Sequence, residues 1–159
     1  MRRMNAYKPD RTPVTVLEEI FPQDTNPWGT AFGGKILALM DRAAGLVASR
    51  YAHGHFVTAS MDAIEFRKPV KQGEIAEVVA TLVYTSARTC GIKVEVNALD
   101  KGDWLRRPCC QGLIFMVAKG PDGKTQPVPP MKLISEQERR DWGVAAKIHK
   151  AMLERKAQR

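Results

Sequence analysis

The sequence predicts an α+β protein in which a strongly curved antiparallel sheet wraps one long buried helix. Two observations lead to this prediction: one helical segment is apolar around most of its circumference, and four long strand-like segments follow it, joined by short turns. A helix of that kind needs a sheet that curves around it. The chain has 159 residues, 44% of them hydrophobic and 26% charged, which suits one globular domain and excludes a disordered or collagen-like chain.

The first predicted strand covers Val14 to Phe21, where β-branched residues come first. The following run, PQDTNPWGTAFGG, is rich in Pro, Gly and Asn and predicts a loop. The loop leads into a helix expected from about Phe32 to Tyr51. At about 100° per residue, the apolar arc of this helix is wide and includes Met40, so the helix should be buried. Asp41 lies off its charged stripe, on a side made of small residues.

The rest of the body is strand-like. Four strands are expected, at Val57 to Phe66, Glu74 to Thr85, Gly91 to Leu99 and Cys109 to Lys119. Short connections between successive long strands predict antiparallel pairing. Because a single helix covers only one face of the sheet, the other face predicts a homo-oligomer.

A second helix is predicted to begin at Ser135, where Ser135 followed by Glu138 forms a capping box. Its thin apolar stripe predicts an amphipathic helix that rests on the body or on a partner chain. We therefore divide the chain into a basic leader (1–12), one folded domain (13–130) and a basic C-terminal helix and tail (131–159).

The formal charge of +8 comes almost entirely from the two ends, since the body carries 13 basic and 12 acidic residues. This distribution argues against a nucleic-acid groove, although basic tails could still bind nucleic acid, a phosphorylated small molecule or a membrane surface. No window approaches the ~20 apolar residues of a membrane span, and no secretory signal is visible. The three cysteines, Cys90, Cys109 and Cys110, predict no disulfide framework. We expect no stable membrane insertion and a cytoplasmic location.

The candidate chemistry lies on the first helix and at its start. The glycines Gly33 and Gly34 open the helix, whose first amides and dipole would stabilise the negative charge that develops on an ester or thioester oxygen. Asp41 lies two turns further along, where a carboxylate among apolar residues is costly unless it is paired or used. It could activate water or attack a carbonyl held at the helix start. The alternative is that Asp41 simply pairs with a nearby cation or caps a backbone group.

Other chemistries have weaker signals. His53 and His55 could bind a metal ion, but no third ligand is evident. The chain contains no Walker loop, dinucleotide fingerprint or GxSxG elbow. The basic side chains of the body could together bind the phosphates of coenzyme A, although each alone is more typical of a solvated surface charge. These residues are Arg67, Lys68, Lys71, Arg88, Arg106 and Arg107.

The run DTNPWGTAFGGKILALMD, from Asp24 to Asp41, resembles the D-x-N-x-x-G-x-x-x-G-G…M-D signature of hotdog-fold acyl-CoA thioesterases, which include the brain-type acyl-CoA hydrolases. The resemblance continues through Val57-Thr58-Ala59 and through Phe66-Arg67-Lys68-Pro69-Val70, followed by Gly73-Glu74. It covers Val14 to Pro129 and leaves out the leader and the basic tail.

The resemblance implies a five-stranded hotdog sheet, a homodimer whose two sheets join, and a trimer of such dimers. It also implies a site shared across the dimer, in which Asp41 is the catalytic carboxylate. Asn26 from the opposing subunit would place water or the thioester, and Gly33 or Gly34 would donate to the carbonyl oxygen. Five further residues are expected to bind the substrate or its coenzyme A part: Thr58, Lys68, Thr85, Ser86 and Arg88.

The expected function is hydrolysis of acyl-CoA thioesters to a free acid and coenzyme A. No metal or redox cofactor is expected, and coenzyme A enters only as part of the substrate. Two alternatives keep the fold: a hydratase or dehydratase, which usually needs a His that is missing from Gly33 to Ala48, and a non-catalytic acyl-CoA binding or regulatory protein. Trp28 is a bulky residue for its place in the motif and leaves the acyl-chain length open.

Overall fold

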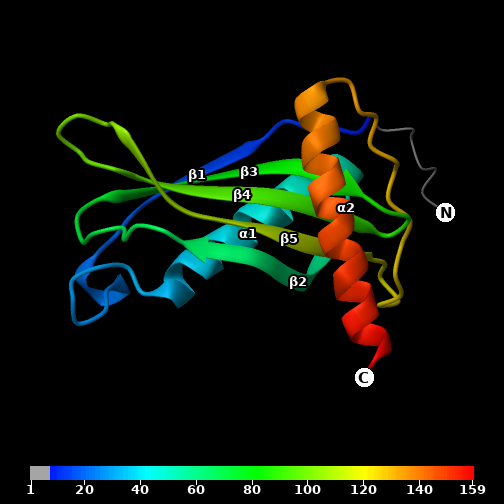
Figure 1. Cartoon of the computed structure of the whole chain (residues 1–159), viewed down its shortest axis with the longest axis horizontal. Helices are drawn as coiled ribbons and strands as arrows, with labels where there is room; N and C mark the ends of the chain where they lie inside the picture. Colours follow the sequence, from blue (N-terminus) through cyan, green and yellow to red (C-terminus); the bar gives the residue numbers. More distant parts are fainter. Residues whose placement is uncertain (1–7) are drawn as a thin grey trace.

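The computed structural model describes residues 8–159, so residues 1–7 of the predicted leader lie outside the described part (Figure 1). A 3-10 turn, η1, covers Pro22–Asp24 between the first strand and the first helix. The elements are β1 (Val14–Glu19), α1 (Gly33–Ala52), β2 (His55–Phe66), β3 (Ile75–Thr85), β4 (Thr89–Leu99), β5 (Arg106–Lys119) and α2 (Glu136–Ala157).

The predicted architecture is confirmed. The five strands form one antiparallel sheet in the order β1-β3-β4-β5-β2, which leaves β1 and β2 at its edges. The pairing of β2 with β5 shifts register at two places, between Thr58 and Ser60 and between Asp62 and Glu65. Such bulges bend a strand and help the sheet to curve around α1. Strands β2 and β5 begin two and three residues before the predicted starts, because main-chain pairing continues beyond the apolar runs.

Helix α1 packs against the concave side of the sheet, as its wide apolar arc predicts (Figure 1). The buried residues of α1 are Ile36, Leu39, Met40, Ala43, Ala44, Val47, Ala48 and Tyr51. Lys35, from the charged stripe, holds the start of the helix: its ammonium lies 2.5 Å from Glu18 of β1 and 3.3 Å from Asp24. These hydrogen bonds, opposed by burial, raise the pKa of Lys35.

Helix α2 crosses the opposite face of the sheet, where Ala145 packs with Tyr84 and Phe115 (Figure 1). The expectation that this face needs another chain is therefore corrected in part, since α2 of the same chain covers some of it. The predicted cap at Ser135 is present, because its hydroxyl accepts the Glu138 amide at 3.1 Å. The reciprocal contact differs: Glu138 accepts the amide of Ile134 at 2.7 Å, one residue before the predicted donor.

Neither helix of the described chain is long and apolar enough to cross a membrane. All three cysteines are buried and free, as the sequence predicts.

Candidate active site

The Asp41 carboxylate lies half-buried where α1 passes the edge strand β2. It accepts a short hydrogen bond from the hydroxyl of Thr58 on β2. The same hydroxyl lies 3.5 Å from the sulfur of Met116 on β5. Among the residues that the structure describes, no cation forms an ion pair with Asp41. The ion-pair alternative for this carboxylate is therefore not supported.

Asn26 shapes the loop before α1. Its side-chain oxygen accepts the amides of Trp28 at 3.0 Å and of Thr30 at 3.2 Å, and its side-chain nitrogen donates to the Thr30 hydroxyl at 2.9 Å. The carboxamide thus closes its own turn, which lies between β1 and the start of the helix. Trp28 at the tip of this loop is 83% exposed.

The first amides of α1 are open to a ligand. Phe32 at the N-cap offers no side-chain acceptor, and no acceptor within residues 8–159 binds the N–H groups of Gly33 and Gly34. A Cβ added at Gly34 would lie 2.9 Å from the Phe32 ring, and one at Gly33 would lie 3.6 Å from the Phe66 ring. Two aromatic side chains therefore flank these donors, and only small residues leave the amides accessible.

Asp41 does not reach the amides at the start of its own helix. Seven residues separate it from Gly34, and at 1.5 Å per residue this corresponds to about 10 Å. A carbonyl bound at these amides would therefore meet the carboxylate only through a bridging group such as a water. The expectation that one helix holds the carboxylate within reach of a carbonyl at its own N-terminus stays a prediction.

The residues expected to bind coenzyme A are also divided. Lys68 follows the end of β2 at Phe66. The turn Ser86 to Arg88 lies beside Cys90, which pairs with Met116, and Met116 pairs in turn with Thr58 near the start of β2. Thr58 and Phe66 are eight positions apart on β2, about 26 Å at the usual rise of a strand. One chain therefore does not bring them together.

Two of these residues also have partners within the chain. Thr85 is buried, and its hydroxyl accepts the Met131 amide at 2.9 Å. The guanidinium of Arg88 donates to the Thr125 hydroxyl at 2.7 Å but remains exposed. Thr85 thus anchors the C-terminal segment, which disfavours the expected contact with substrate.

The site residues consequently form two groups, one around Asp41 and Thr58 and one around the start of α1, with Asp41 about 10 Å along the helix from Gly34. We call the first the carboxylate end (Asp41, Thr58, Ser86 and Arg88) and the second the glycine end (Asn26, Gly33, Gly34 and Lys68). The glycine end is one unit, because the amide of Ala31 donates to the carbonyl of Val70 at 2.7 Å, and that of Gln72 to Gly29 at 2.9 Å.

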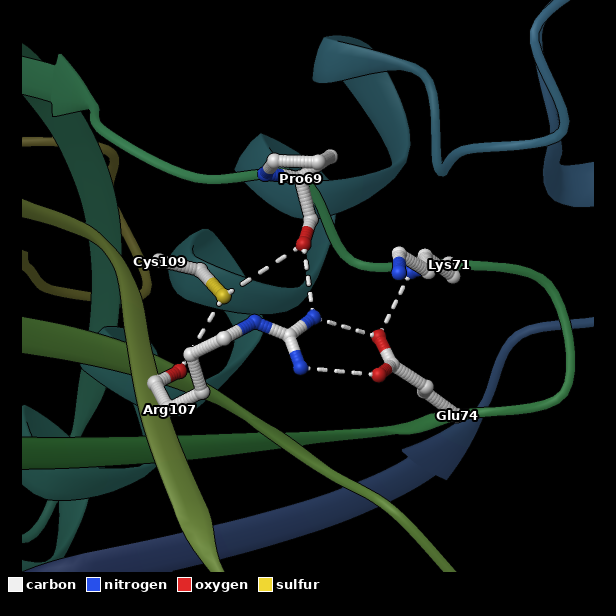
Figure 2. A network of polar contacts seen from close by, with 5 residues as sticks. All are labelled: Pro69, Lys71, Glu74, Arg107 and Cys109. Carbon is white, nitrogen blue, oxygen red and sulfur yellow. Dashed lines mark hydrogen bonds and ion pairs between the residues drawn. The ribbon is translucent and has the colours of Figure 1, made fainter.

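Two of the basic residues considered as phosphate ligands form ion pairs in the structure. Arg107 binds Glu74 beside the glycine end (Figure 2), and Arg106 binds Glu77 further along β3. Neither arginine is therefore a free phosphate ligand. Each pair joins residues about 30 positions apart, so no spacing in the sequence could reveal it.

No metal site emerges from His53 and His55: the described residues contain no group of three or more His, Cys, Asp or Glu that could hold a metal ion. A pocket of about 240 Å³ lies under α2, lined by Val83, Leu113 and Ile148 among others. It is on the sheet face away from α1 and so does not include Asp41.

Comparison with known proteins agrees with this geometry. A family model described as the thioesterase superfamily matches residues 29–104. YkhA, an uncharacterized acyl-CoA thioester hydrolase of Bacillus subtilis, is 35% identical over 127 residues, which are 79% of this chain and 73% of YkhA. The crystal structure of an apo-hexameric acyl-CoA thioesterase aligns with a TM-score of 0.86 and 30% identity, over 96% of this chain and 98% of that one.

A further structural neighbour is an acyl-CoA hydrolase from Staphylococcus aureus, solved with butyryl coenzyme A, coenzyme A and coenzyme A disulfide. It aligns with a TM-score of 0.83 and 27% identity, over 92% of this chain and 89% of that one. Alanine mutants of an aspartate, a threonine and an asparagine of this hydrolase have also been solved.

A curved antiparallel sheet around a buried helix is the hotdog fold, and the family-model match identifies the thioesterase superfamily within it. The chain belongs to the acyl-CoA thioester hydrolase family of that superfamily. The family expected from the DTNPWGTAFGGKILALMD motif is thus confirmed.

Proposed function

We propose that this acyl-CoA thioester hydrolase cleaves its substrate in a site formed by the carboxylate end of one copy and the glycine end of another. The observation that carries the proposal is the hydrogen bond from Thr58, which holds Asp41 about 10 Å from the amides of its own helix start. A carbonyl that Asp41 attacks directly would need its amide donors from another chain. In the general-base route a water lies between the carboxylate and the carbonyl, and the pairing of two chains through β2 supplies the same donors.

Strand β2 is the edge through which two copies would pair. It lies at the end of the sheet, and Val57 and Phe66 near its two ends are 47% and 54% exposed. Antiparallel pairing of two β2 strands about a two-fold axis places Thr58 of one copy opposite the second half of β2 in the other. The carboxylate end of one copy then meets the glycine end of the other. The hexameric thioesterase among the structural neighbours supports a trimer of such dimers.

In this site the thioester oxygen accepts the N–H groups of Gly33 and Gly34, and the helix dipole stabilises its growing negative charge. Asn26 places the water or the thioester. Asp41 either removes a proton from water, which then adds to the carbonyl carbon, or attacks that carbon itself. The carbon–sulfur bond breaks, and the coenzyme A sulfur leaves as a thiolate and takes up a proton. In the second route the product of this step is an anhydride of the acyl group and Asp41, which water then hydrolyses to the free acid and the Asp41 carboxylate. Protein groups and water suffice for this reaction.

The residue assignment has independent support from spacing. In the Staphylococcus aureus hydrolase, the mutated aspartate lies 15 residues after the mutated asparagine and 17 before the mutated threonine. Asp41 lies 15 residues after Asn26 and 17 before Thr58. The identical spacing matches the three positions of this chain one by one.

The coenzyme A phosphates are assigned to Lys68 from the glycine end and to Ser86 and Arg88 from the carboxylate end. All three residues belong to loops, where their side chains can contact a bound nucleotide. A cytoplasmic location fits three free cysteines, because reducing compartments keep thiols unpaired.

The decisive experiment measures thiol release from acyl-CoAs of several lengths by wild type and by Asp41→Asn. Loss of the carboxylate should lower kcat by about 10² or more, while size-exclusion chromatography shows the oligomer unchanged. Undiminished turnover in the variant would falsify the assignment. Tight acyl-CoA binding by wild type without thiol release would instead identify a non-catalytic binding protein, and loss of enoyl-CoA absorbance without thiol release would identify a hydratase.

The two routes for Asp41 are separated by one turnover in ¹⁸O-labelled water at excess enzyme. An unlabelled first product shows a carboxylate nucleophile whose anhydride water opens at the Asp41 carbonyl, whereas a general base always yields a labelled acid.

A further inference from the structure

A partly buried ion pair lies behind the glycine end. Arg107 forks onto Glu74, with Nη1 donating to Oε1 at 2.9 Å and Nη2 to Oε2 at 2.8 Å (Figure 2). The Glu74 side chain is only 10% exposed. Burial by itself would raise the pKa of Glu74, but hydrogen bonds from Arg107 and the Lys71 amide outweigh it and hold the pKa below its ordinary value. The pair is therefore charged at neutral pH.

The same two side chains bind the main chain that follows Lys68. Arg107 Nη2 also donates to the carbonyl of Pro69 at 3.1 Å, and the amide of Lys71 donates to Glu74 Oε2 at 2.8 Å. Figure 2 shows Pro69 and Lys71 on the same side of the forked pair, with Pro69 bound to the Arg107 guanidinium and Lys71 to the Glu74 carboxylate. The backbone after Lys68 is thus tied to β3 and β5 by side-chain charges.

Strand β5 also holds the main chain at Lys68 itself. The amides of Arg67 and Lys68 donate to the carbonyl of Cys109 at 2.8 and 3.2 Å. Cys109 lies two residues after Arg107 on β5. The backbone of Lys68 is therefore fixed from both sides, whereas its side chain remains exposed and free to contact a ligand.

Stability alone does not explain a charged pair at this place. A buried ion pair is often no more stabilising than well-packed apolar residues of similar size. Apolar side chains, however, could not bind the carbonyl of Pro69 or the amide of Lys71. What the charges add is a defined position for the main chain.

The molecule contains a matched pair without this connection. Arg106 forks onto Glu77 at 2.7 and 3.0 Å, and the Glu77 side chain is 6% exposed. The additional partner of Glu77 is the Asn97 side chain at 3.0 Å, on the neighbouring strand. This second pair joins β5 to Glu77 within β3, three residues beyond Glu74, and does not touch the segment of Lys68.

We infer that the Glu74–Arg107 pair is a positioning device for Lys68, through which Arg107 affects binding of the coenzyme A phosphates without touching the substrate. The inference rests on the proposed function, in which Lys68 contacts those phosphates. It assigns to Arg107 an effect on affinity for the nucleotide part of the substrate and little effect on the chemical step.

The test is a titration of the full-length protein with coenzyme A, together with kinetics on acyl-CoA. Arg107→Lys keeps the charge, but one ammonium cannot both fork onto Glu74 and bind Pro69. We expect its Kd for coenzyme A and its KM to rise about fivefold with kcat within about twofold, and Lys68→Ala to weaken binding about tenfold. The double variant Lys68→Ala/Arg107→Lys should bind no more weakly than Lys68→Ala, because Arg107 acts through Lys68.

Two controls separate positioning from general damage. Arg106→Lys should leave Kd and KM unchanged, and acyl-pantetheine, which lacks the nucleotide phosphates, should show the same KM with wild type and Arg107→Lys. The double variant Glu74→Gln/Arg107→Met replaces Arg107→Lys if the latter folds poorly. It removes both charges without leaving one buried alone, and it should raise the Kd for coenzyme A about fivefold as well.

Additive losses in the Lys68 double variant, an equal loss with acyl-pantetheine, or an equal loss in Arg106→Lys would overturn the inference. So would wild-type affinity in Arg107→Lys when the wild-type protein binds coenzyme A and releases thiol. A wild-type protein that does neither would overturn the proposed function first.

Discussion

Thr58 shows how strongly the site depends on single hydroxyl groups. Its O–H is the hydrogen-bond donor to Asp41, and it reaches the carboxylate from a strand that pairs with only one neighbour in the chain. The motif from Asp24 to Asp41 made Asp41 and Asn26 candidates, and Thr58 entered only as a substrate-binding residue. Sequence patterns could not assign it to Asp41, because a contact between a helix and a strand has no fixed spacing.

Replacing Thr58 with Val should lower kcat about tenfold, since a hydrogen bond to a charged group contributes about 1.5–3 kcal/mol and this site is partly open to solvent. Thr58→Ser keeps the hydroxyl and should stay within about threefold of wild type. Thiol-release kinetics at saturating acyl-CoA measure both. Equal turnover in Thr58→Val and wild type would show that Asp41 needs no such partner.

At the scale of elements, helix α2 is held on the sheet by an aromatic cluster around a buried histidine. His149 is 6% exposed, its Nδ1 lies 3.1 Å from the Tyr84 hydroxyl, and its ring centroid lies 5.2 Å from that of Phe115. Burial lowers the pKa of His149 below 6.5; the Asp62 carboxylate of β2 opposes this shift and Lys156 of α2 adds to it. The amphipathic stripe predicted the helix but not the face on which it rests.

This histidine predicts a pH dependence of stability. A folded-state pKa below the unfolded value means that the unfolded chain binds the proton more readily. The stability is therefore complete above about pH 6.5 and is lost as the pH falls from there through the lower folded pKa of His149. Thermal midpoints measured from pH 7.5 to 5 should fall in wild type and fall less in His149→Gln. Parallel curves for the two proteins would contradict the assignment. The buried carboxylates Glu74 and Glu77, whose pKa values are lowered, add their losses only at more acidic pH.

At the scale of the whole molecule, the proposed site needs two copies of the chain, because it combines the carboxylate end of one with the glycine end of another. The motif places Asn26, Gly33, Gly34 and Asp41 within 16 consecutive positions, yet a straight helix separates the last two by about 10 Å. The common helix suggested that Gly34 and Asp41 act together within one chain, whereas the family resemblance implied a site shared across a dimer, and the proposed site follows the latter.

Mixing two inactive variants tests this arrangement. Asp41→Asn disables the carboxylate end, and Asn26→Ala disables the glycine end. In a mixed dimer both defects fall in one shared site and the other site is intact, so random reassociation of equal amounts should recover up to about a quarter of wild-type activity. Coexpression with two different tags and purification over both isolates assemblies that contain both variants. Activity no higher than that of the separate variants would show that each chain carries a complete site.

The sequence by itself determined the elements of this protein and the family to which it belongs. Hydrophobic periodicity and turn residues are local, so the buried helix, the strands and the start of α2 could be predicted within a few residues. Only the tertiary structure decided which side chains meet: Thr58 with Asp41, Arg107 with Glu74, Thr85 with Met131, and Lys68 far from Arg88. These contacts follow from strand order and sheet curvature, which depend on how the whole sheet closes around α1 and not on any short stretch of chain.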